Sequence, residues 1–327
     1  MPKKISRTKE KIFYLMSENC RTPYSELGKQ INKSAQYARS LIQGLEAENT
    51  LTYYILVDYS LLKLLAFRVY FKGGFTDESE LKNLIKQISK SKLVTIIRTI
   101  SGPYDLQVDF LAPNPSRFNK EIKTLVSART ELTNYDVILY VVSHHFSRAY
   151  LTLNTQNKGN TIIGGDRKPL LLDENQKKVL KILIENPRAT ILSISEKTSL
   201  NVRTVINIIK KLESSNVIRG FKAEIDVYKI GYVKNRIILK LHNTNVVSEQ
   251  RLLNHCIENP NITTFSKTIG SWDIEIDVEA EDNLDFRKIY LEIREKFKDI
   301  IQSFNYFSLL DVHKRKYIPD VYFEEQD

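Results

Sequence analysis

Residues 172–231 read LDENQKKVLKILIENPRATILSISEKTSLNVRTVINIIKKLESSNVIRGFKAEIDVYKIG. Asp173 stands where a helix N-cap belongs, ahead of apolar residues at helical spacing, and Pro187 is expected to end that helix. A second short helix over about 190–197 and a turn lead to Asn201, which caps a third helix. The stretch therefore predicts a helix followed by a helix-turn-helix and a β-wing.

The outward face of the third helix has the chemistry of a DNA reader. It carries only hydrogen-bond donors and cations: Arg203, Thr204, Asn207, Lys210 and Lys211. Such side chains suit the base edges of a major groove, and Arg219 and Lys222 in a following short strand pair suit phosphate. The alternative is a plain three-helix packing module, which the basic outer face disfavours.

A weaker copy of this stretch lies near the N-terminus. Residues 5–51 match 172–218 without a gap, so that Leu45 and Leu212 lie 167 positions apart. This register indicates a tandem duplication. The first copy places its recognition helix at 34–46, and the outward residues are Ala35, Gln36, Arg39, Ser40 and Gln43. This face is more neutral, and Gly44 weakens the helix by roughly 1 kcal/mol, so the copy either binds DNA less strongly or has a structural role.

An α+β stretch follows each helix-turn-helix. In the first copy we expect strands and helices at 64–71, 78–89, 93–99, 104–111, 115–127 and 136–143, and in the second at 236–241, 248–258, 262–268, 272–279, 284–298 and 303–310. Both orders are βαββαβ, the ferredoxin-like unit. The predicted fold class is α+β, with domains at 1–58 (winged helix-turn-helix), 59–153 (ferredoxin-like), 170–229 (winged helix-turn-helix) and 230–327 (ferredoxin-like), and a linker at 154–169.

Composition narrows the class of protein. A net charge of +10 and a pI near 9.3 favour a polyanionic partner. The sequence has no apolar run long enough to span a membrane and no secretory signal, so we expect no membrane partner and a cytoplasmic location. Two cysteines, Cys20 and Cys256, are too few for a disulfide framework and are expected to be buried. We find no catalytic motif and no Cys/His spacing typical of a metal site, and expect no cofactor.

Each α+β unit has a tight turn with the same residue types. Gly102 and Asp105 lie in the first, and Gly270 and Asp273 in the second. Glycine permits an unusual backbone angle and the aspartate can accept hydrogen bonds from nearby amides, so hairpin chemistry alone explains the pattern. The alternative is a pocket that binds both charges of a free amino acid.

At this point the sequence resembles the Lrp/AsnC (feast/famine) family of transcription regulators. The second copy carries LDxxxxxVLxxLxxNxR in its first helix, LExxxVIxGF at the wing and Gly-x-x-Asp in the α+β unit. The resemblance implies a DNA-binding winged helix joined to a regulatory domain that dimerises through its sheet, with amino-acid effectors near Gly102–Asp105 and Gly270–Asp273. Two departures are Asn49 and Asn216 where the family usually has glycine, and the tandem form itself. Asn tolerates a left-handed turn.

The duplication predicts that one chain folds as its own pseudo-dimer, sheet against sheet, able to associate further into a homodimer or larger oligomer. Because the two recognition faces differ, the preferred site on double-stranded DNA should be an imperfect palindrome. Two other functions stay open: an architectural DNA-binding protein, and an enzyme or sensor on the same scaffold, as in sirohaem decarboxylases. The alternating acids from Asp273 to Glu279 predict a solvated or interface surface.

Overall fold

Both repeats fold in the predicted order of elements. A computed structural model describes residues 5–73, 77–129, 132–152, 159–242 and 245–324. The first repeat contains α1 Arg7–Glu18, α2 Tyr24–Gln30, α3 Ala35–Ala47, β1 Leu51–Val57, η1 Tyr59–Leu62, β2 Leu65–Phe71, α4 Glu78–Ile88, β3 Val94–Ser101, β4 Leu106–Ala112, α5 Pro115–Ser127 and β5 Tyr135–Phe146. The second contains α6 Glu174–Glu185, α7 Ile191–Thr198, α8 Val202–Ser214, β7 Ile218–Ile225, η4 Tyr228–Ile230, β8 Val233–Leu241, α9 Val246–Glu258, β9 Ile262–Ile269, β10 Ile274–Ala280, α10 Asn283–Lys296 and β11 Ile301–Arg315. The α+β class and the tandem βαββαβ organisation are confirmed.

The helix caps predicted at Asp173 and Asn201 are present, and the first winged-helix unit has an equivalent cap. The Asp173 carboxylate accepts a hydrogen bond from the Gln176 amide, and the Gln176 side-chain oxygen accepts one from the Asp173 amide. Asn201 caps α8 through the Thr204 amide at 2.7 Å, and Ser34 caps α3. Each cap satisfies an amide that the first helical turn leaves without a partner, which fixes where the recognition helices begin.

Two asparagines end the recognition helices in the left-handed conformation. Asn49 has φ 50° and Asn216 has φ 62°, at equivalent positions of the two repeats. Asn adopts this region more readily than most residues, because its short polar side chain can bond locally. The prediction that Asn replaces a turn glycine here is confirmed.

Replacing Asn216 by alanine should lower the free energy of unfolding by about 1 kcal/mol, because a Cβ without local polar compensation disfavours positive φ. Asn216→Gly should cost less or nothing. Urea unfolding of both variants tests this. Ser214→Ala, on the exposed last turn of α8, is the control and should change stability by less than about 0.5 kcal/mol. Equal losses for Asn216→Ala and Asn216→Gly would contradict the conformational explanation.

The strand after each recognition helix pairs with the other repeat. β1 and β7 form a two-stranded antiparallel ribbon in which Tyr54 lies opposite Lys222. The predicted strand pair within the second winged helix at Arg219–Lys222 is therefore wrong, because these residues pair with β1. The ribbon joins both winged-helix cores into one apolar cluster that includes Ile12, Ile55 and Val205.

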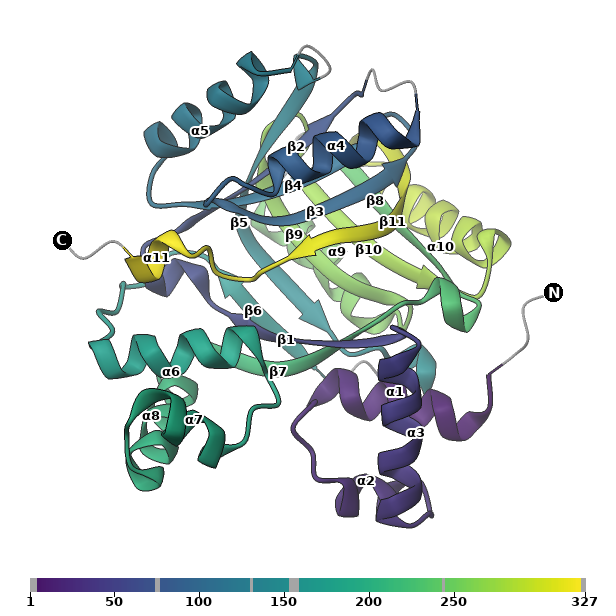
Figure 1. The fold of residues 1–327 in the computed structure, drawn as a ribbon. Coiled ribbons are helices and arrows are strands. Elements are labelled where there is room, and N and C mark those ends of the chain that lie inside the picture. The colour runs from purple at the N-terminus through teal and green to yellow at the C-terminus, as the bar shows by residue number, and fades with distance from the viewer. Residues whose placement is uncertain (1–4, 74–76, 130–131, 153–158, 243–244, 325–327) are drawn as a thin grey trace.

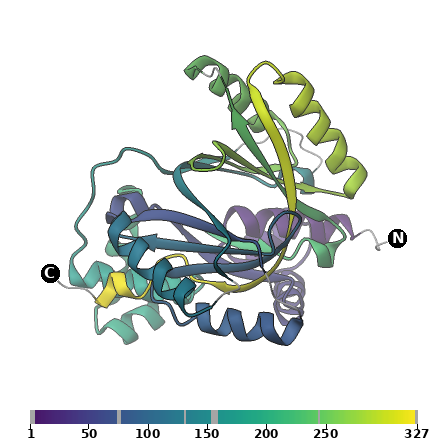
Figure 2. The same ribbon diagram turned by 90° about the horizontal axis from the view of Figure 1, so that it is seen from above.

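The two ferredoxin-like sheets join at their edges and close on themselves. β3 pairs with β11 and β5 pairs with β9, while β2 pairs with β5, so eight strands run in a closed circle. β5 and β11 are longer than predicted. The N-terminal part of each strand pairs within its own repeat, and the C-terminal part pairs with a strand of the other repeat. In Figure 2, α9 and α10 lie on one side of the joined sheets and α4 and α5 on the other. One face of each sheet therefore packs on helices, and the opposite face lines the barrel.

Part of the predicted linker is structured. β6, Asn160–Gly164, pairs antiparallel with β5 as a ninth strand, so a linker over the whole of 154–169 is wrong. Residues 154–158 of that prediction lie outside the described residues. A 3₁₀ turn, η3 Ala149–Leu151, precedes this segment, and a short C-terminal helix, α11 Val321–Glu324, ends the described chain. Within the described ranges, no helix combines the length and the apolar character that a membrane span requires.

Candidate nucleic-acid interface and the barrel cavity

The face of α8 that was predicted to read DNA is open to solvent. Four of its side chains are exposed and Thr204 is half-buried; the exposed ones are Arg203, Asn207, Lys210 and Lys211. The opposite face buries Val205, Ile208, Ile209 and Leu212 against α6 and α7. The amphipathic pattern thus fixes the rotation of α8, and a long polar strip faces outward.

The equivalent face of α3 is exposed but nearly uncharged. Gln36, Arg39, Ser40 and Gln43 are all solvent-exposed, and Arg39 is their one cation. Position 203 in α8 corresponds to Gln36, and position 207 to Ser40. The two helices therefore present equivalent surfaces with different hydrogen-bonding groups.

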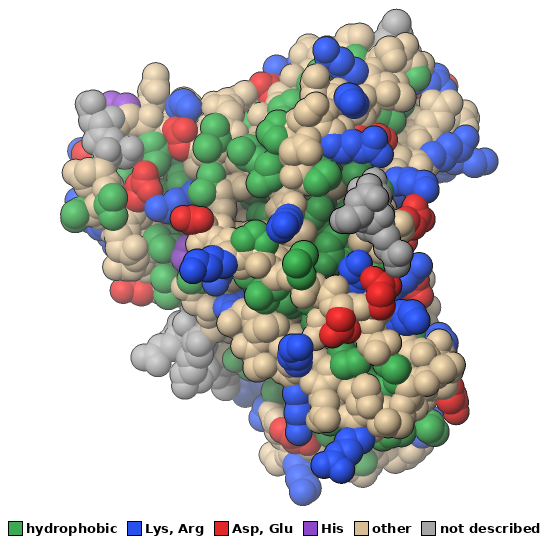
Figure 3. Space-filling model, turned by 90° about the vertical axis from the view of Figure 1, so that its left-hand side faces the viewer, with side chains coloured by type: hydrophobic (Ala, Val, Ile, Leu, Met, Phe, Trp, Pro, Cys, Tyr) green, Lys and Arg blue, Asp and Glu red, His purple; other side chains and the backbone are tan. Residues whose placement is uncertain are grey.

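The two winged-helix units lie side by side beneath the joined sheets (Figure 1). Arg21 of the first donates to the Pro187 carbonyl of the second at 2.8 Å. In return, Arg188 contacts the Glu46 carboxylate at 2.7 Å and lies over the ring of Tyr53. These reciprocal contacts involve residues at equivalent positions 21 and 188, so the recognition helices are held as one unit. In the side view, Lys and Arg side chains are spread over the lower part of the molecule, where the second winged helix lies, with acidic groups between them (Figure 3).

The two basic residues of β7 do not share one role. Arg219 is partly exposed next to α8 and donates to Asn216. Lys222 instead points into a cavity, with its side chain 18% exposed and its ammonium group 3.8 Å from Glu18. Burial lowers the pKa of Lys222. Lys222 is therefore misplaced in the predicted phosphate-binding set.

The two glycine turns pack against the opposite repeat. Gly102 has φ 144° and a Cβ there would lie 2.9 Å from Phe307 Cβ on β11; Gly270 has φ 151° and a Cβ would lie 2.6 Å from the Val137 carbonyl on β5. Each turn thus needs glycine both for its backbone angle and for close approach to a partner strand.

The turn aspartates bind backbone amides. Asp105 accepts from the Gly73 amide at 2.7 Å, and Asp273 accepts from the Leu241 amide at 2.8 Å and pairs with Lys240 at 2.9 Å. Neither turn lines the barrel cavity described below. Hairpin and edge chemistry accounts for all the contacts that the structure gives these residues.

Asp273→Ala should therefore lower the free energy of unfolding by about 1–3 kcal/mol, because it leaves the Leu241 amide without its acceptor. Thermal denaturation measures the loss, and Asp273→Asn, which keeps an acceptor oxygen, should recover part of it. The alternative, an amino-acid effector site at this turn, would be favoured by a different result: Asp273→Ala stays as stable as the wild type but no longer binds an amino acid that the wild type binds.

Paired charges line the inside of the barrel. Arg68 binds Asp109 through Nε and Nη2, both at 2.6 Å, and at equivalent positions Arg236 binds Asp277 at 2.5 and 2.7 Å. Glu275 lies between them and contacts both arginines, at 2.9 and 3.1 Å. Three of the predicted alternating acids, Glu275, Asp277 and Glu279, are thus buried inside the barrel, whereas Asp273 lies in the partly exposed turn.

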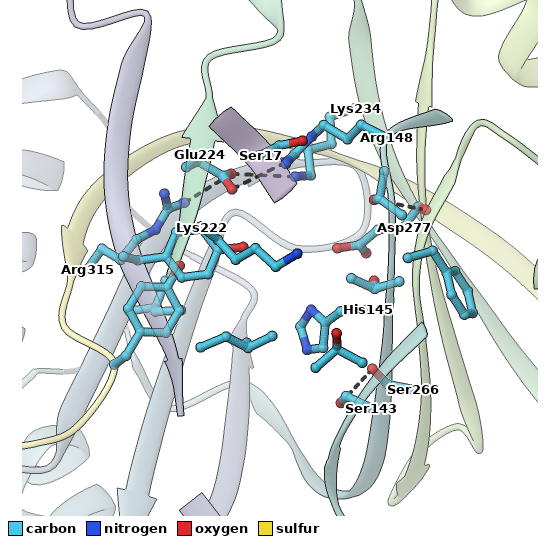
Figure 4. A pocket seen from close by; sticks show the side chains of 18 of the residues that line it. Ser17, Ser143, His145, Arg148, Lys222, Glu224, Lys234, Ser266, Asp277 and Arg315 are labelled. Carbon is cyan, nitrogen blue, oxygen red and sulfur yellow. Dashed lines mark hydrogen bonds and ion pairs between the residues drawn. The ribbon is translucent and has the colours of Figure 1, made fainter. Parts of the chain in front are cut away.

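A cavity of about 200 Å³ opens at the end of the barrel that faces the β1–β7 ribbon. Figure 4 shows Lys222 and Asp277 pointing toward one another across it, with the His145 ring below them. Burial lowers the pKa of His145 to about 4, so this imidazole is neutral at pH 7. The alternation of His145 with Ser143 along β5 is the one sequence signal that both side chains face the same side of the sheet.

Metal binding and cysteine chemistry have no site among the described residues. No three of their His, Cys, Asp and Glu side chains come together as a metal-binding group. Cys20 and Cys256 are fully buried free thiols, as predicted, and burial raises the pKa of Cys20 to about 12. Both thiols are therefore unreactive at neutral pH.

Comparison with known proteins adds evidence from sequence and fold. Residues 172–219 match the winged helix-turn-helix DNA-binding family model. An uncharacterised HTH-type transcriptional regulator of Pyrococcus furiosus is 31% identical over 32% of this chain and 68% of its own length. The HTH-type transcriptional regulator FL11 of Pyrococcus horikoshii is 31% identical over 34% of this chain and 73% of its own.

One solved structure matches almost the whole chain in fold. The sirohaem decarboxylase NirDL, in complex with an iron-uroporphyrin III analogue, aligns with a TM-score of 0.59 at 12% identity, over 95% of this chain and 94% of that one. At this identity the likeness extends to the fold alone. It shows that the same two-repeat architecture occurs in another single chain.

Proposed function

Because the chain belongs to the Lrp/AsnC family of HTH-type transcriptional regulators, we propose that it is a sequence-specific DNA-binding regulator that acts as an intrachain pseudo-dimer. The exposed polar strip on α8 carries this proposal. It offers Arg203 and Asn207, whose side chains suit guanine and adenine edges, with Lys210 and Lys211 for phosphate. The proposed DNA set further comprises Thr204 and Arg219 on the second repeat and Gln36, Arg39, Ser40 and Gln43 on the first.

In each repeat, the winged helix would bind DNA and the ferredoxin-like unit would be regulatory. We propose boundaries near 58 and 229 between winged-helix and ferredoxin-like units, with β1 and β7 as the connecting strands. The reciprocal contacts of Arg21 and Arg188 support a fixed spacing between the two readers. A fixed spacing suits two half-sites about one helical turn apart, or a multiple of it. Since α3 and α8 differ, the half-sites should differ as well.

Footprinting on the DNA upstream of the chain's own gene, at several salt concentrations, tests the proposal. We expect two protected segments of unequal strength, with affinity falling as salt rises because phosphate contacts release counterions. Uniform coating of any DNA would favour an architectural protein. No binding even at low salt would contradict both.

An enzyme on this scaffold is the second candidate, and the fold of NirDL favours it. The barrel cavity weighs against a substrate of tetrapyrrole size, because its volume of about 200 Å³ lies below the roughly 300–1,000 Å³ of pockets for drug-sized ligands. An absorption spectrum of the purified protein separates the two, since a bound tetrapyrrole absorbs strongly in the visible range.

A further inference from the structure

The barrel cavity has more positive than negative charge in its walls. Seven of its lining residues are Lys or Arg and three are Asp or Glu. Four of the cations are neutralised by carboxylates in or behind the wall: Arg68, Arg148, Lys234 and Arg236. The remaining cations are Arg98, Lys222 and Arg315, which gather on the side of β3, β7 and β11.

Arg98 is the least compensated of these cations. Its residue is 7% exposed, and within the described parts of the chain its side chain has no hydrogen bond or ion pair. Among the residues that the structure describes, Arg315 has one carboxylate partner, Glu224 at 3.2 Å, and its Nε is buried without a hydrogen bond. In the same described ranges, the one carboxylate paired with Lys222 is Glu18, at 3.8 Å. A buried charge without a partner is costly, so this arrangement destabilises the empty protein.

The equivalent strands of the opposite repeat show that the fold does not require these arginines. The position equivalent to Arg98, 168 residues away in the duplication, is Ser266. Arg315 lies opposite Ile96, and His145 lies opposite Thr264, the equivalent of Ile96, so His145 is the equivalent of Arg315. Ser266 and His145 line the same cavity, and Ser266 donates to Ser143 at 2.8 Å. One side of the cavity is therefore lined by neutral hydroxyls and the neutral His145 ring, while positive charge is concentrated on the other side. Packing alone does not explain this difference, since the strands are equivalent.

We propose that this cavity binds a small anion that carries one or two carboxylate or phosphate groups, with Arg98 as the principal contact and Lys222 and Arg315 beside it. Guanidinium groups bind both oxyanions with paired hydrogen bonds, and the volume limits the ligand to a small metabolite. The hydroxyls of Ser143, Ser147 and Ser266 on the opposite wall supply neutral donors.

The position of the cavity connects it to the DNA readers. Lys222 lies on β7, which begins four residues after α8 ends, and Ser17 and Glu18 on the same wall belong to α1. An anion that draws Lys222 away from Glu18 alters a contact between the ribbon and the first winged helix. Resting on the proposed regulator function, we expect the anion to change DNA affinity.

Binding is tested first without DNA, by calorimetry and thermal denaturation of the full chain at constant ionic strength. The probes are inorganic phosphate, pyrophosphate and succinate, with chloride as the baseline. We expect at least one probe to bind saturably and to raise the melting temperature. Preference for phosphate or for carboxylate probes identifies which oxyanion the natural ligand carries. No saturable binding of any probe above the chloride baseline would overturn the proposal.

The variant Arg98→Ser copies the residue that the second repeat already accommodates. It should weaken probe binding at least tenfold and raise the melting temperature of the ligand-free protein, because it removes an uncompensated buried charge. Arg98→Lys should keep part of the affinity. Arg251→Ser, which removes an exposed arginine paired with Asp299, is the control and should leave probe binding unchanged. Unchanged binding by Arg98→Ser would overturn the proposal.

A gel shift with and without the best probe then tests regulation. A change in DNA affinity that Arg98→Ser abolishes supports the coupling. If the chain binds the probe but no DNA, the regulator function fails while the anion site stands. If it binds DNA but no probe, the anion site fails alone.

Discussion

The double variant Arg203→Ala/Asn207→Ala is expected to lose sequence-specific protection of its DNA site. Both side chains are exposed on one face of α8, and neither makes a side-chain hydrogen bond or ion pair within the described parts of the chain. A bidentate contact to a base edge contributes about 1–3 kcal/mol of discrimination, so removing two should weaken specific binding by roughly 2–6 kcal/mol. This corresponds to at least about a 30-fold loss, while non-specific affinity changes less.

Footprinting and a competition gel shift with unrelated DNA measure this loss. The fold should be unaffected, since exposed substitutions without partners change stability by less than about 0.5 kcal/mol. The duplication supplies a matched control: Gln36→Ala/Ser40→Ala changes the equivalent positions of α3 and should weaken one half-site only. Lys210→Ala should mainly reduce the salt dependence, by about one unit of slope. Unaltered protection of the same bases by the double variant would show that α8 does not read them.

The elements of this fold were predictable because their signals are local. Helix caps at Asp173 and Asn201, and apolar residues at helical spacing, depend only on neighbours along the chain. α5 begins and ends where predicted, at Pro115 and Ser127, because a proline at its first position marks the start. The left-handed asparagine at 216 is a local property as well.

The partner of each strand was not predictable. Alternation of apolar and polar residues shows which face of a strand is buried, but it does not show which other strand pairs with it. The sequence pattern of Ile218–Ile225 fits either a strand of a local β-wing or a strand that pairs with the other repeat. In the structure this segment pairs with β1 of the other repeat. β5 extends to Phe146 because its second half pairs with β9 of the other repeat. Both outcomes depend on contacts more than 100 residues apart, which no local window contains.

The candidate functional residues also include some that were predictable from local sequence and some that were not. The outward residues of α8 follow from helical geometry and were identified from sequence. The cavity was not, because Arg98, Lys222 and Arg315 come from three strands that only the closed barrel brings together. One signal was available: Arg68 with Asp109 and Arg236 with Asp277 recur 168 positions apart, which predicts equivalent ion pairs in both repeats.

Glu279→Gln is expected to destabilise the protein by about 3–5 kcal/mol, the usual cost of breaking a buried ion pair on one side. Glu279 is fully buried and binds Arg148 at 2.8 Å, Lys234 at 2.8 Å and the Tyr150 hydroxyl at 2.6 Å. The amide keeps the shape but removes the charge, which leaves two cations facing a neutral group. Urea unfolding at pH 7 measures the loss.

The pH dependence of stability distinguishes loss of charge from loss of packing. Burial alone would raise the pKa of Glu279, but Arg148 and Lys234 outweigh it and lower the pKa to about 2. As pH falls, Glu279 is therefore protonated near pH 4.5 in the unfolded chain but only near pH 2 in the folded chain. The stabilisation that the Glu279 charge provides is complete above pH 4.5 and is lost as pH falls toward 2. The difference in stability between wild type and Glu279→Gln should shrink over that window. Glu78→Gln, in an exposed pair with Lys82, is the control and should cost less than about 0.5 kcal/mol. A difference that stays constant with pH would assign the loss to packing, because a neutral contact does not titrate.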